Sequence, residues 1–226
     1  TYVHAASLSA DSYQKIAATG GNVSLATESE DTCGQGYPPV HHLRRYGIPA
    51  SLSVDTSVWF SADLFSAMRA TVNADRALEH FHAHQLEPAE TITHVKLRAE
   101  DVVHMATRGG AQAIGKDAEI GSLEAGKLAD VVLLKNEDSP TWAPLINPWG
   151  QVVYQAQRGD VHTVLVGGEV VKSNGKVVAG DLAGVKAKLE DTVGYLQTEV
   201  GDEWVSGQYP EIPEAEVLYN PYQYKK

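Results

Sequence analysis

The chain has 226 residues, of which 43% are hydrophobic and 21% are charged, a balance that argues against global disorder. Its 18 Lys and Arg residues and 29 Asp and Glu residues give a formal net charge of −11, which would repel phosphate backbones and excludes nucleic acid as an expected partner. The single cysteine, Cys33, excludes an intrachain disulfide framework and a cysteine-rich zinc site, and it fits a reducing, cytoplasmic location.

The amino-terminal residues do not have the pattern of a targeting segment. Residues 1–5 contain no basic region and no apolar core, so we expect no signal peptide. No apolar run in the chain approaches the roughly 18 to 20 residues that cross a bilayer, so we expect no membrane partner. The chain has no starting Met and opens inside a strand-like pattern, which predicts a truncated or processed polypeptide.

The first 55 residues alternate strand patterns with helix patterns. Strands are predicted over residues 2–5, 22–26 and 49–54, with a helix from the N-cap Ser9 and a second helix over 40–46 that stops at Gly47. Strand, helix and strand with short connections predict parallel strands joined by crossover helices, and therefore an α/β fold.

Two chemically able side chains are expected at the carboxyl edge of this sheet, where parallel α/β folds bind ligands. His4 ends the first strand and Asp55 ends the third, and residues 27–30, predicted as a loop, lie at the same edge. An imidazole and a carboxylate can bind a metal or move a proton, although a catalytic zinc site typically takes three protein ligands. The alternative is that His4 packs in the core and that Asp55 only caps the next loop.

Nine histidines make metal binding worth testing elsewhere in the chain. His80 and His84 share one helix face, but they lie at a polar helix end where cationic side chains complement the helix dipole, so a metal site is not favoured. His41 and His42 are interpreted as a solvated pair on the short helix. The chain has no phosphate-binding loop, no G-x-S-x-G motif and no P-C-x-x-C motif.

The middle of the chain is predicted to be helical. A long helix is expected after an N-cap at Ser61, with Phe65 and Met68 interpreted as core residues rather than pocket lining. A further helix opens at Glu100 and is expected to break at the glycine pair 109–110.

The pattern turns to β structure after Gly115. Strands are predicted over 128–135, 163–166, 169–172 and 176–178, with a hairpin turn at 167–168, which indicates an antiparallel meander in a separate layer. Residues 152–156 fit a strand or a helix equally well. An amphipathic helix is predicted over 182–200, followed by an aromatic tail that we expect to cover another surface.

Several of these segments resemble the amidohydrolase superfamily, in its cytosine-deaminase and chlorohydrolase-like branch. EIGSLEAGKLADVVLL at 119–134 resembles the entry into the small β-domain of that branch, and residues 105–115 resemble the helix before it. LSVDTS at 52–57 resembles the eighth barrel strand, VHA at 3–5 resembles the sixth, and 161–171 resembles the closing hairpin. The resemblance covers most of residues 1–180.

The resemblance implies a fold and a domain organisation. Residues 1–116 would be the C-terminal part of a (β/α)8 TIM-type barrel, comprising about three βα units. Residues 117–180 would be part of a small β-sandwich domain, and residues 181–226 would form a C-terminal helix and tail.

The resemblance also implies a metal-dependent hydrolase of C–N bonds other than peptide bonds, or of C–halogen bonds, which attacks a small-molecule substrate with metal-activated water. Asp55 would be a ligand of the divalent metal (zinc, iron or manganese) and would accept the proton of the water, while His4 would contact that water or the substrate. The expected substrate-binding residues are Glu28, Thr56, Ser57 and Trp59.

The chain also departs from the family pattern. The His-x-His of the first barrel strand and the His and Glu of the fifth are absent, so the full metal-ligand set is not present in this chain. Three strands cannot close a barrel, so we expect a missing N-terminal half or another chain as partner. We therefore expect no activity of this chain alone. We also expect a homo-oligomer. Residues 25–27 (LAT) stand where the branch often has His-Cys-Pro, so the substrate is not identified.

The main alternative is a non-catalytic α/β association module. In that interpretation the β-layer, Trp204 and the tyrosine-rich tail would mediate association, and no metal would be bound. A further possibility is that the missing half is a separate polypeptide that docks on this one.

Overall fold

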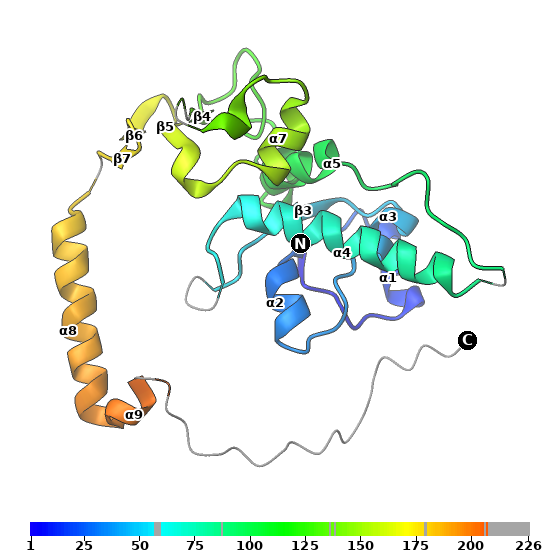
Figure 1. Cartoon of the computed structure of the whole chain (residues 1–226), viewed down its shortest axis with the longest axis horizontal. Helices are drawn as coiled ribbons and strands as arrows, with labels where there is room; N and C mark the ends of the chain where they lie inside the picture. The colour runs from blue at the N-terminus through cyan, green and yellow to red at the C-terminus, as the bar shows by residue number, and fades with distance from the viewer. Residues whose placement is uncertain are drawn as a thin grey trace. The chain divides into compact units, whose positions relative to one another are not determined.

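The structure, a computed structural model, describes residues 1–56, 60–86, 88–135, 137, 139–178, 180–205 and 207. The chain divides into two compact units, Thr1–Lys176 and Val177–Lys226, which are described separately (Figure 1). The division expected from the sequence, at residues 117 and 181, remains a prediction.

A parallel sheet of three short strands organises the first unit. Strands β1 (Tyr2–Val3), β2 (Val23–Leu25) and β3 (Ala50–Leu52) pair in parallel, in the order β1-β2-β3. Helix α1 (Ala10–Ala18) joins the first two strands, and helices α2 (Thr27–Thr32) and α3 (Val40–Tyr46) lie between β2 and β3 in the chain. This arrangement confirms the parallel α/β prediction.

The predicted start of α1 and the predicted end of α3 are confirmed. Ser9 caps α1, because its hydroxyl accepts a hydrogen bond from the Ser12 N–H, which would otherwise lack a partner in the first turn. Gly47 ends α3 in the left-handed conformation, with φ 65°, which costs a residue without a Cβ little energy.

The loop predicted over residues 27–30 is wrong, because helix α2 (Thr27–Thr32) begins immediately after β2. Ala26 cannot cap this helix with its side chain, and that hid the helix start in the sequence. The carboxylate of Glu30 accepts a hydrogen bond from the Ala26 N–H at 2.9 Å instead. The capping group therefore comes from inside the helix.

The long helix α4 (Leu64–His84) is confirmed, but its predicted N-cap is wrong. Asp63 caps it by accepting a hydrogen bond from the Phe65 N–H at 2.8 Å, while Ser61 donates to a carboxylate of α2. Helix α4 contacts α2, α3 and β3, and also α5 (Ala99–His104) and α7 (Pro148–Tyr154). It thus connects most of the first unit (Figure 1).

The predicted helix break at residues 109–110 is also wrong. Helix α5 (Ala99–His104) continues through the π-helical turn η1 (Met105–Gly109) into α6 (Gly110–Ala113). The two glycines keep helical backbone angles. A Cβ at Gly109 would lie closer than 3.0 Å to the Ala50 carbonyl oxygen, so this glycine allows the helix to approach β3, whereas a Cβ at Gly110 would meet open space.

The β meander of the sequence prediction is present. Strands β4 (Val131–Leu134), β5 (Val161–Val166), β6 (Glu169–Ser173) and β7 (Lys176–Val177) form one sheet in that order, and the pairs β4–β5 and β5–β6 are antiparallel. Gly167 and Gly168 have φ 57° and 88°, as the predicted hairpin turn requires.

Short helical elements lie between β4 and β5. They are η2 (Pro140–Trp142), α7 (Pro148–Tyr154) and η3 (Arg158–Asp160). The ambiguous segment 152–156 is thus helical over its first three residues.

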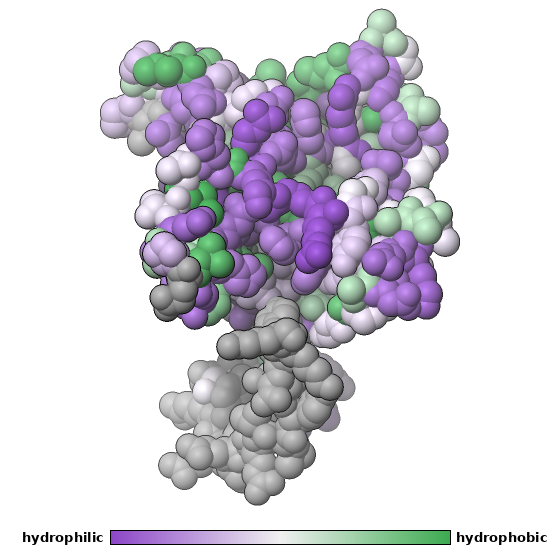
Figure 2. Space-filling view, turned by 90° about the vertical axis from the view of Figure 1, so that its right-hand side faces the viewer, coloured by the Kyte–Doolittle hydropathy of each residue, from purple (hydrophilic) through white to green (hydrophobic). Residues whose placement is uncertain are grey.

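The core of the first unit lies between the parallel sheet and its helices. Met68 is 4% exposed and belongs to this core, which confirms its interpretation as a packing residue. One face of the molecule shows hydrophilic side chains interrupted by scattered apolar patches (Figure 2). The buried members of the core are Tyr13, Ile16, Val23, Leu25, Val40, Leu43, Ile48, Met68, Val72, Leu97, Val102 and Val153.

The second unit contains helices α8 (Leu182–Val200) and α9 (Asp202–Val205). The predicted apolar stripe of α8 is exposed to solvent: Leu189, for example, is 60% exposed. The tail tyrosines lie outside the described residues, so their expected packing stays a prediction. Among the described helices, none is both long enough and apolar enough to cross a membrane.

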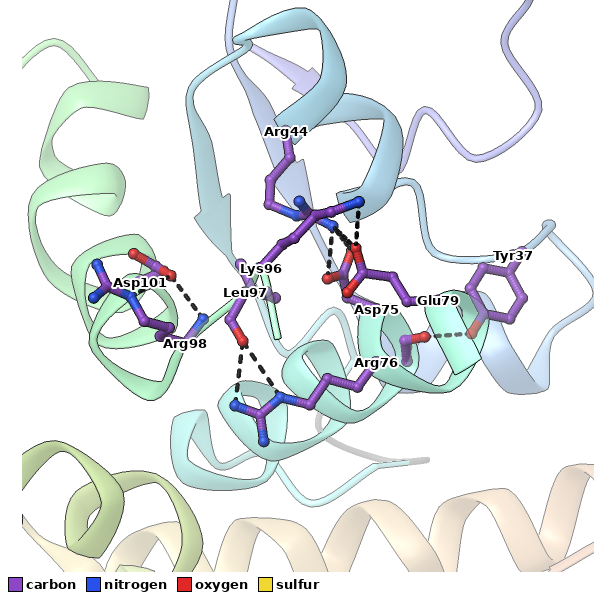
Figure 3. Close-up of polar contacts among 10 residues, drawn as sticks. Tyr37, Arg44, Asp75, Arg76, Glu79, Lys96, Leu97, Arg98 and Asp101 are labelled. Carbon is purple, nitrogen blue, oxygen red and sulfur yellow. Dashed lines mark hydrogen bonds and ion pairs between the residues drawn. The ribbon is translucent and has the colours of Figure 1, made fainter. Parts of the chain in front are cut away.

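An ionic cluster with two buried carboxylates, those of Asp75 and Glu79, joins α3 to α4 (Figure 3). Arg44 donates to both carboxylate oxygens of Asp75 at 3.0 and 2.9 Å and to Glu79 at 3.0 Å, and Lys96 lies 3.3 Å from Glu79. Burial raises the pKa of Asp75 despite this pairing. Burial also acts to raise the pKa of Glu79, but the hydrogen bonds from Arg44 and Lys96 outweigh it and lower that pKa.

We expect Arg44→Met to lower the free energy of unfolding by about 3–5 kcal/mol, because it leaves the Asp75 carboxylate buried without its counter-ion. The matched control is Lys15→Met, which removes the exposed pair between Lys15 and Asp11 and should cost less than about 1 kcal/mol. Urea unfolding followed by circular dichroism measures both values. Equal losses in the two variants would contradict a structural role for the cluster.

Gly109→Ala and Gly110→Ala should have opposite effects on stability. The new Cβ at residue 109 meets the Ala50 carbonyl oxygen and should destabilise the protein by about 1–3 kcal/mol. The same change at residue 110 removes backbone entropy from the unfolded chain and should stabilise by up to about 1 kcal/mol. Thermal unfolding of the two variants tests this pair, and a stabilising Gly109→Ala would refute the close approach.

Candidate functional site

The carboxyl ends of β1 and β3 bring His4 and Asp55 together. The Nε2 atom of His4 lies 3.9 Å from an Asp55 carboxylate oxygen, and their side chains are 26% and 34% exposed. His4 is therefore not a buried core residue. The two groups share one edge of the parallel sheet, from which both can reach a ligand.

Local hydrogen bonds hold Asp55 in place. Its Oδ2 accepts a hydrogen bond from the Ser29 hydroxyl at 2.5 Å, and its backbone N–H donates to the Ser53 hydroxyl at 3.0 Å. Asp55 has φ 54°, and His4 and Ala5 both have φ 61°. Non-glycine residues rarely adopt this left-handed conformation, which costs energy and is concentrated at functional sites.

Glu30 contacts His4 and is a site residue that the sequence pattern did not predict. Its Oε1 lies 3.3 Å from His4 Nδ1 and also accepts the Ala26 N–H, while Oε2 has no hydrogen-bond partner among the described residues. Burial raises the pKa of this carboxyl, and the bonds from Ala26 and His4 act in the opposite direction. Predicting a helix at residues 27–30 would have pointed to Glu30. Residues two positions apart on a helix are separated by about 200°, so only one of Glu28 and Glu30 can face inward.

The other predicted substrate residues lie around this pair to different degrees. Glu28 accepts a hydrogen bond from the Ser61 hydroxyl at 2.8 Å, so its carboxylate is engaged with the segment before α4. Thr56 is half-buried next to Asp55. Ser57 and Trp59 lie outside the described residues. The roles of all four in substrate binding remain predictions.

The donor set at the sheet edge suits a divalent metal only in part. An imidazole nitrogen and a carboxylate oxygen are both ligands that zinc uses, but a catalytic zinc site typically takes three protein ligands. Within the described parts of the chain, no group of three or more His, Cys, Asp or Glu side chains could hold a metal ion, and this covers His80, His82 and His84. His4 and Asp55 therefore fit as part of a ligand set.

The histidine pair of α3 is packed rather than solvated, so that prediction is wrong. The ring of His42 stacks on Tyr13 at a centroid distance of 4.9 Å, and the ring of His41 meets His82 edge-on at 6.1 Å. Burial lowers the pKa of both histidines. Helix α3 packs against α1 and α4, and these contacts could not be read from the local sequence.

Residues 1–171 match the Amidohydrolase family, and the chain belongs to this family. It is 32% identical over 144 residues to 5-methylthioadenosine/S-adenosylhomocysteine deaminase 1 of Syntrophus aciditrophicus (strain SB), which covers 64% of this chain and 30% of that protein. It is 33% identical over 155 residues to a 5'-deoxyadenosine deaminase of Methanothermobacter thermautotrophicus, which covers 69% of this chain and 33% of that protein. The chain thus spans about a third of the length of these relatives.

Solved structures agree with the family assignment. An adenosine deaminase from Xanthomonas campestris with bound zinc matches 87% of this chain and 42% of its own, at 25% identity and a TM-score of 0.74. An atrazine chlorohydrolase from Arthrobacter aurescens TC1, complexed with zinc, matches 84% of this chain and 39% of its own, at 21% identity and a TM-score of 0.68. The second likeness concerns the fold alone. The mixed α/β fold is thus shared with the amidohydrolases.

His42→Phe should weaken the loss of stability on acidification. The pKa of His42 in the folded protein is below its ordinary value of 6.5. As the pH falls below about 6.5, His42 therefore takes up a proton in the unfolded chain before it does so in the folded chain. The folded state is therefore penalised at low pH, and phenylalanine removes this penalty while it keeps the ring stack on Tyr13. Urea unfolding at pH 7.5 and pH 5 should show a smaller drop for the variant; an equal drop would contradict the assignment.

Proposed function

We propose that this chain supplies His4 and Asp55 to the active site of a metal-dependent deaminase that hydrolyses the exocyclic C–N bond of an aminopurine nucleoside. The observation that carries the proposal is the pairing of these two side chains at the carboxyl edge of a parallel sheet, in a member of the amidohydrolase family. The relatives named as deaminases of adenosine derivatives support this substrate class. C–halogen hydrolysis is less well supported, because the chlorohydrolase resembles this chain in fold only.

The proposal includes the placement of this chain in a larger architecture. The three parallel strands would be consecutive strands of a (β/α)8 barrel. Three strands cannot close a barrel, so the remaining strands would come from other polypeptide. Residues 117–180 would belong to a small β-domain, to which they would contribute the sheet of strands β4 to β7. Further ligands would come from polypeptide outside the described residues. Cytoplasmic location and homo-oligomerisation stay predictions.

The side chains of this site would divide the proton transfers between them. When bound, the divalent ion supplies a water of lowered pKa as the nucleophile. Asp55, one of its ligands, would accept a proton from the attacking water and return it to the leaving amine, so that water and the amine yield a carbonyl compound and ammonia. Ser29 holds the carboxylate by its hydrogen bond, and His4 would orient the water from the facing side.

The family membership favours this enzyme over the non-catalytic association module. An association module has no requirement for a carboxylate that is held by a serine and faced by an imidazole in a costly backbone conformation. The exposed stripe of α8 is available for association in either case.

We expect Asp55→Asn to lower kcat for ammonia release by about 10²–10⁴-fold, since it removes the proton acceptor and keeps the size of the side chain. The assay uses the complete polypeptide encoded by the gene, loaded with zinc, and offers 5'-deoxyadenosine, 5-methylthioadenosine and S-adenosylhomocysteine. Asp11→Asn, an exposed aspartate of α1, is the matched control and should leave the rate unchanged.

Two outcomes would contradict the proposal. One is full activity in Asp55→Asn, and the other is no ammonia release from any aminopurine nucleoside by the complete protein. The 226-residue chain alone should be inactive, because its described residues supply one proposed metal ligand, Asp55, whereas a catalytic zinc site typically takes three protein ligands.

A further inference from the structure

The feature that the proposed mechanism leaves unused is the carboxylate of Glu30. The residue is 1% exposed, although it is charged in its usual state and lies in the first turns of a short helix. Its Oε1 contacts His4 Nδ1 at 3.3 Å and accepts the Ala26 N–H at 2.9 Å. The opposite nitrogen of the same imidazole, Nε2, faces Asp55 at 3.9 Å. The three side chains therefore form a carboxylate–imidazole–carboxylate row across the sheet edge.

The row has a chemical consequence for the imidazole. A neutral histidine carries its proton on one ring nitrogen, and the hydrogen bond at the other nitrogen decides which one. A carboxylate oxygen accepts hydrogen bonds, so Glu30 favours the form of His4 with the proton on Nδ1. Asp55, at 3.9 Å from Nε2, lies beyond hydrogen-bond distance, so it does not compete for the proton, and Nε2 presents its lone pair to the reacting edge.

Helix capping alone does not account for the buried carboxylate. A serine or asparagine at the N-cap satisfies a helix start without burying a charge, whereas an ionised group removed from water is costly unless it is paired. Glu30 Oε2 has no hydrogen-bond partner within the described residues, so the cost is only partly offset. The compensating benefit is the contact of Oε1 with the imidazole.

We propose that Glu30 is a positioning residue that holds His4 as the Nδ1–H form, so that its Nε2 lone pair can accept a hydrogen bond from the attacking water. The proposal rests on the proposed hydrolase function for its purpose, but its structural content concerns only this chain. Glu30 does not itself touch the substrate; it acts through His4. Outer partners of this kind typically contribute 10- to 100-fold to activity.

The first test reads the proton position directly. Protein labelled with ¹⁵N in its histidines is examined at pH 8 by long-range ¹H–¹⁵N correlation, and His4→Gln identifies the His4 signals. The wild type should show His4 as the Nδ1–H form, and Glu30→Met, which removes the acceptor, should shift it toward Nε2–H. Asp31→Asn, an exposed acid next to Glu30 on α2, is the matched control and should change nothing.

The conservative variant sharpens this test. In Glu30→Gln the Ala26 N–H still requires an acceptor, so the amide oxygen should stay where Oε1 lies and continue to accept from His4. Glu30→Gln should therefore keep the Nδ1–H form. An Nε2–H form in the wild type overturns the proposal without any variant, as does an unchanged Nδ1–H form in a folded Glu30→Met protein.

The second test uses turnover of the complete zinc-loaded protein. Glu30→Met should lower kcat for ammonia release by about 10- to 100-fold with KM nearly unchanged, and Glu30→Gln should recover most of the loss. A loss that appears only in KM, or that Gln does not recover, contradicts a positioning role. If the protein releases no ammonia at all, the proposed function fails, whereas the NMR result still decides the Glu30 contact.

Discussion

Parallel pairing of three short strands is the constraint on which the rest of the site depends. Because β1, β2 and β3 run in the same direction, their carboxyl ends meet at one edge, and residues more than 50 positions apart in the chain become neighbours. His4 and Asp55 arrive there from the two outer strands, and α2 follows the middle strand between them. Reversing any one strand would send its side chain to the opposite edge and dismantle the row.

The middle strand contributes through the helix that follows it. Helix α2 places Ser29 against Asp55 and Glu30 against His4, so one turn of helix contacts both members of the pair. Helix α4 packs against α2 and is joined to α3 by the Arg44–Asp75 ion pair. The packing of the helices therefore supports the positions of the polar groups at the sheet edge.

Features set by neighbouring residues were predictable from the sequence. The Ser9 cap, the Gly47 helix end and the glycine turn at residues 167–168 each follow from the chemistry of one or two side chains. The strand pattern likewise predicted the edge that holds His4 and Asp55. These features needed no knowledge of residues distant in the chain.

The misjudged features depend on contacts that the local sequence pattern does not show, most of them between distant residues. Gly109 continues its helix because a strand passes against it, and the histidines of α3 are half-buried because α1 and α4 cover them. The start of α2 was hidden because its cap is a glutamate four residues ahead rather than a residue at the N-cap. For the same reason Glu30 was assigned to a loop and its contact with His4 was not foreseen.

The unusual backbone at the sheet edge also bears on how such a protein can be engineered. Among the non-glycine residues with left-handed φ, His4 and Asp55 at this edge carry reactive groups, whereas Ala5 and Ala62, which precedes α4, carry none. Glycine or asparagine tolerates this conformation better than alanine does. Substitutions at the two alanines could therefore raise thermal stability without exchanging a reactive side chain. At His4 or Asp55, a substitution that relieves backbone strain would remove a catalytic group.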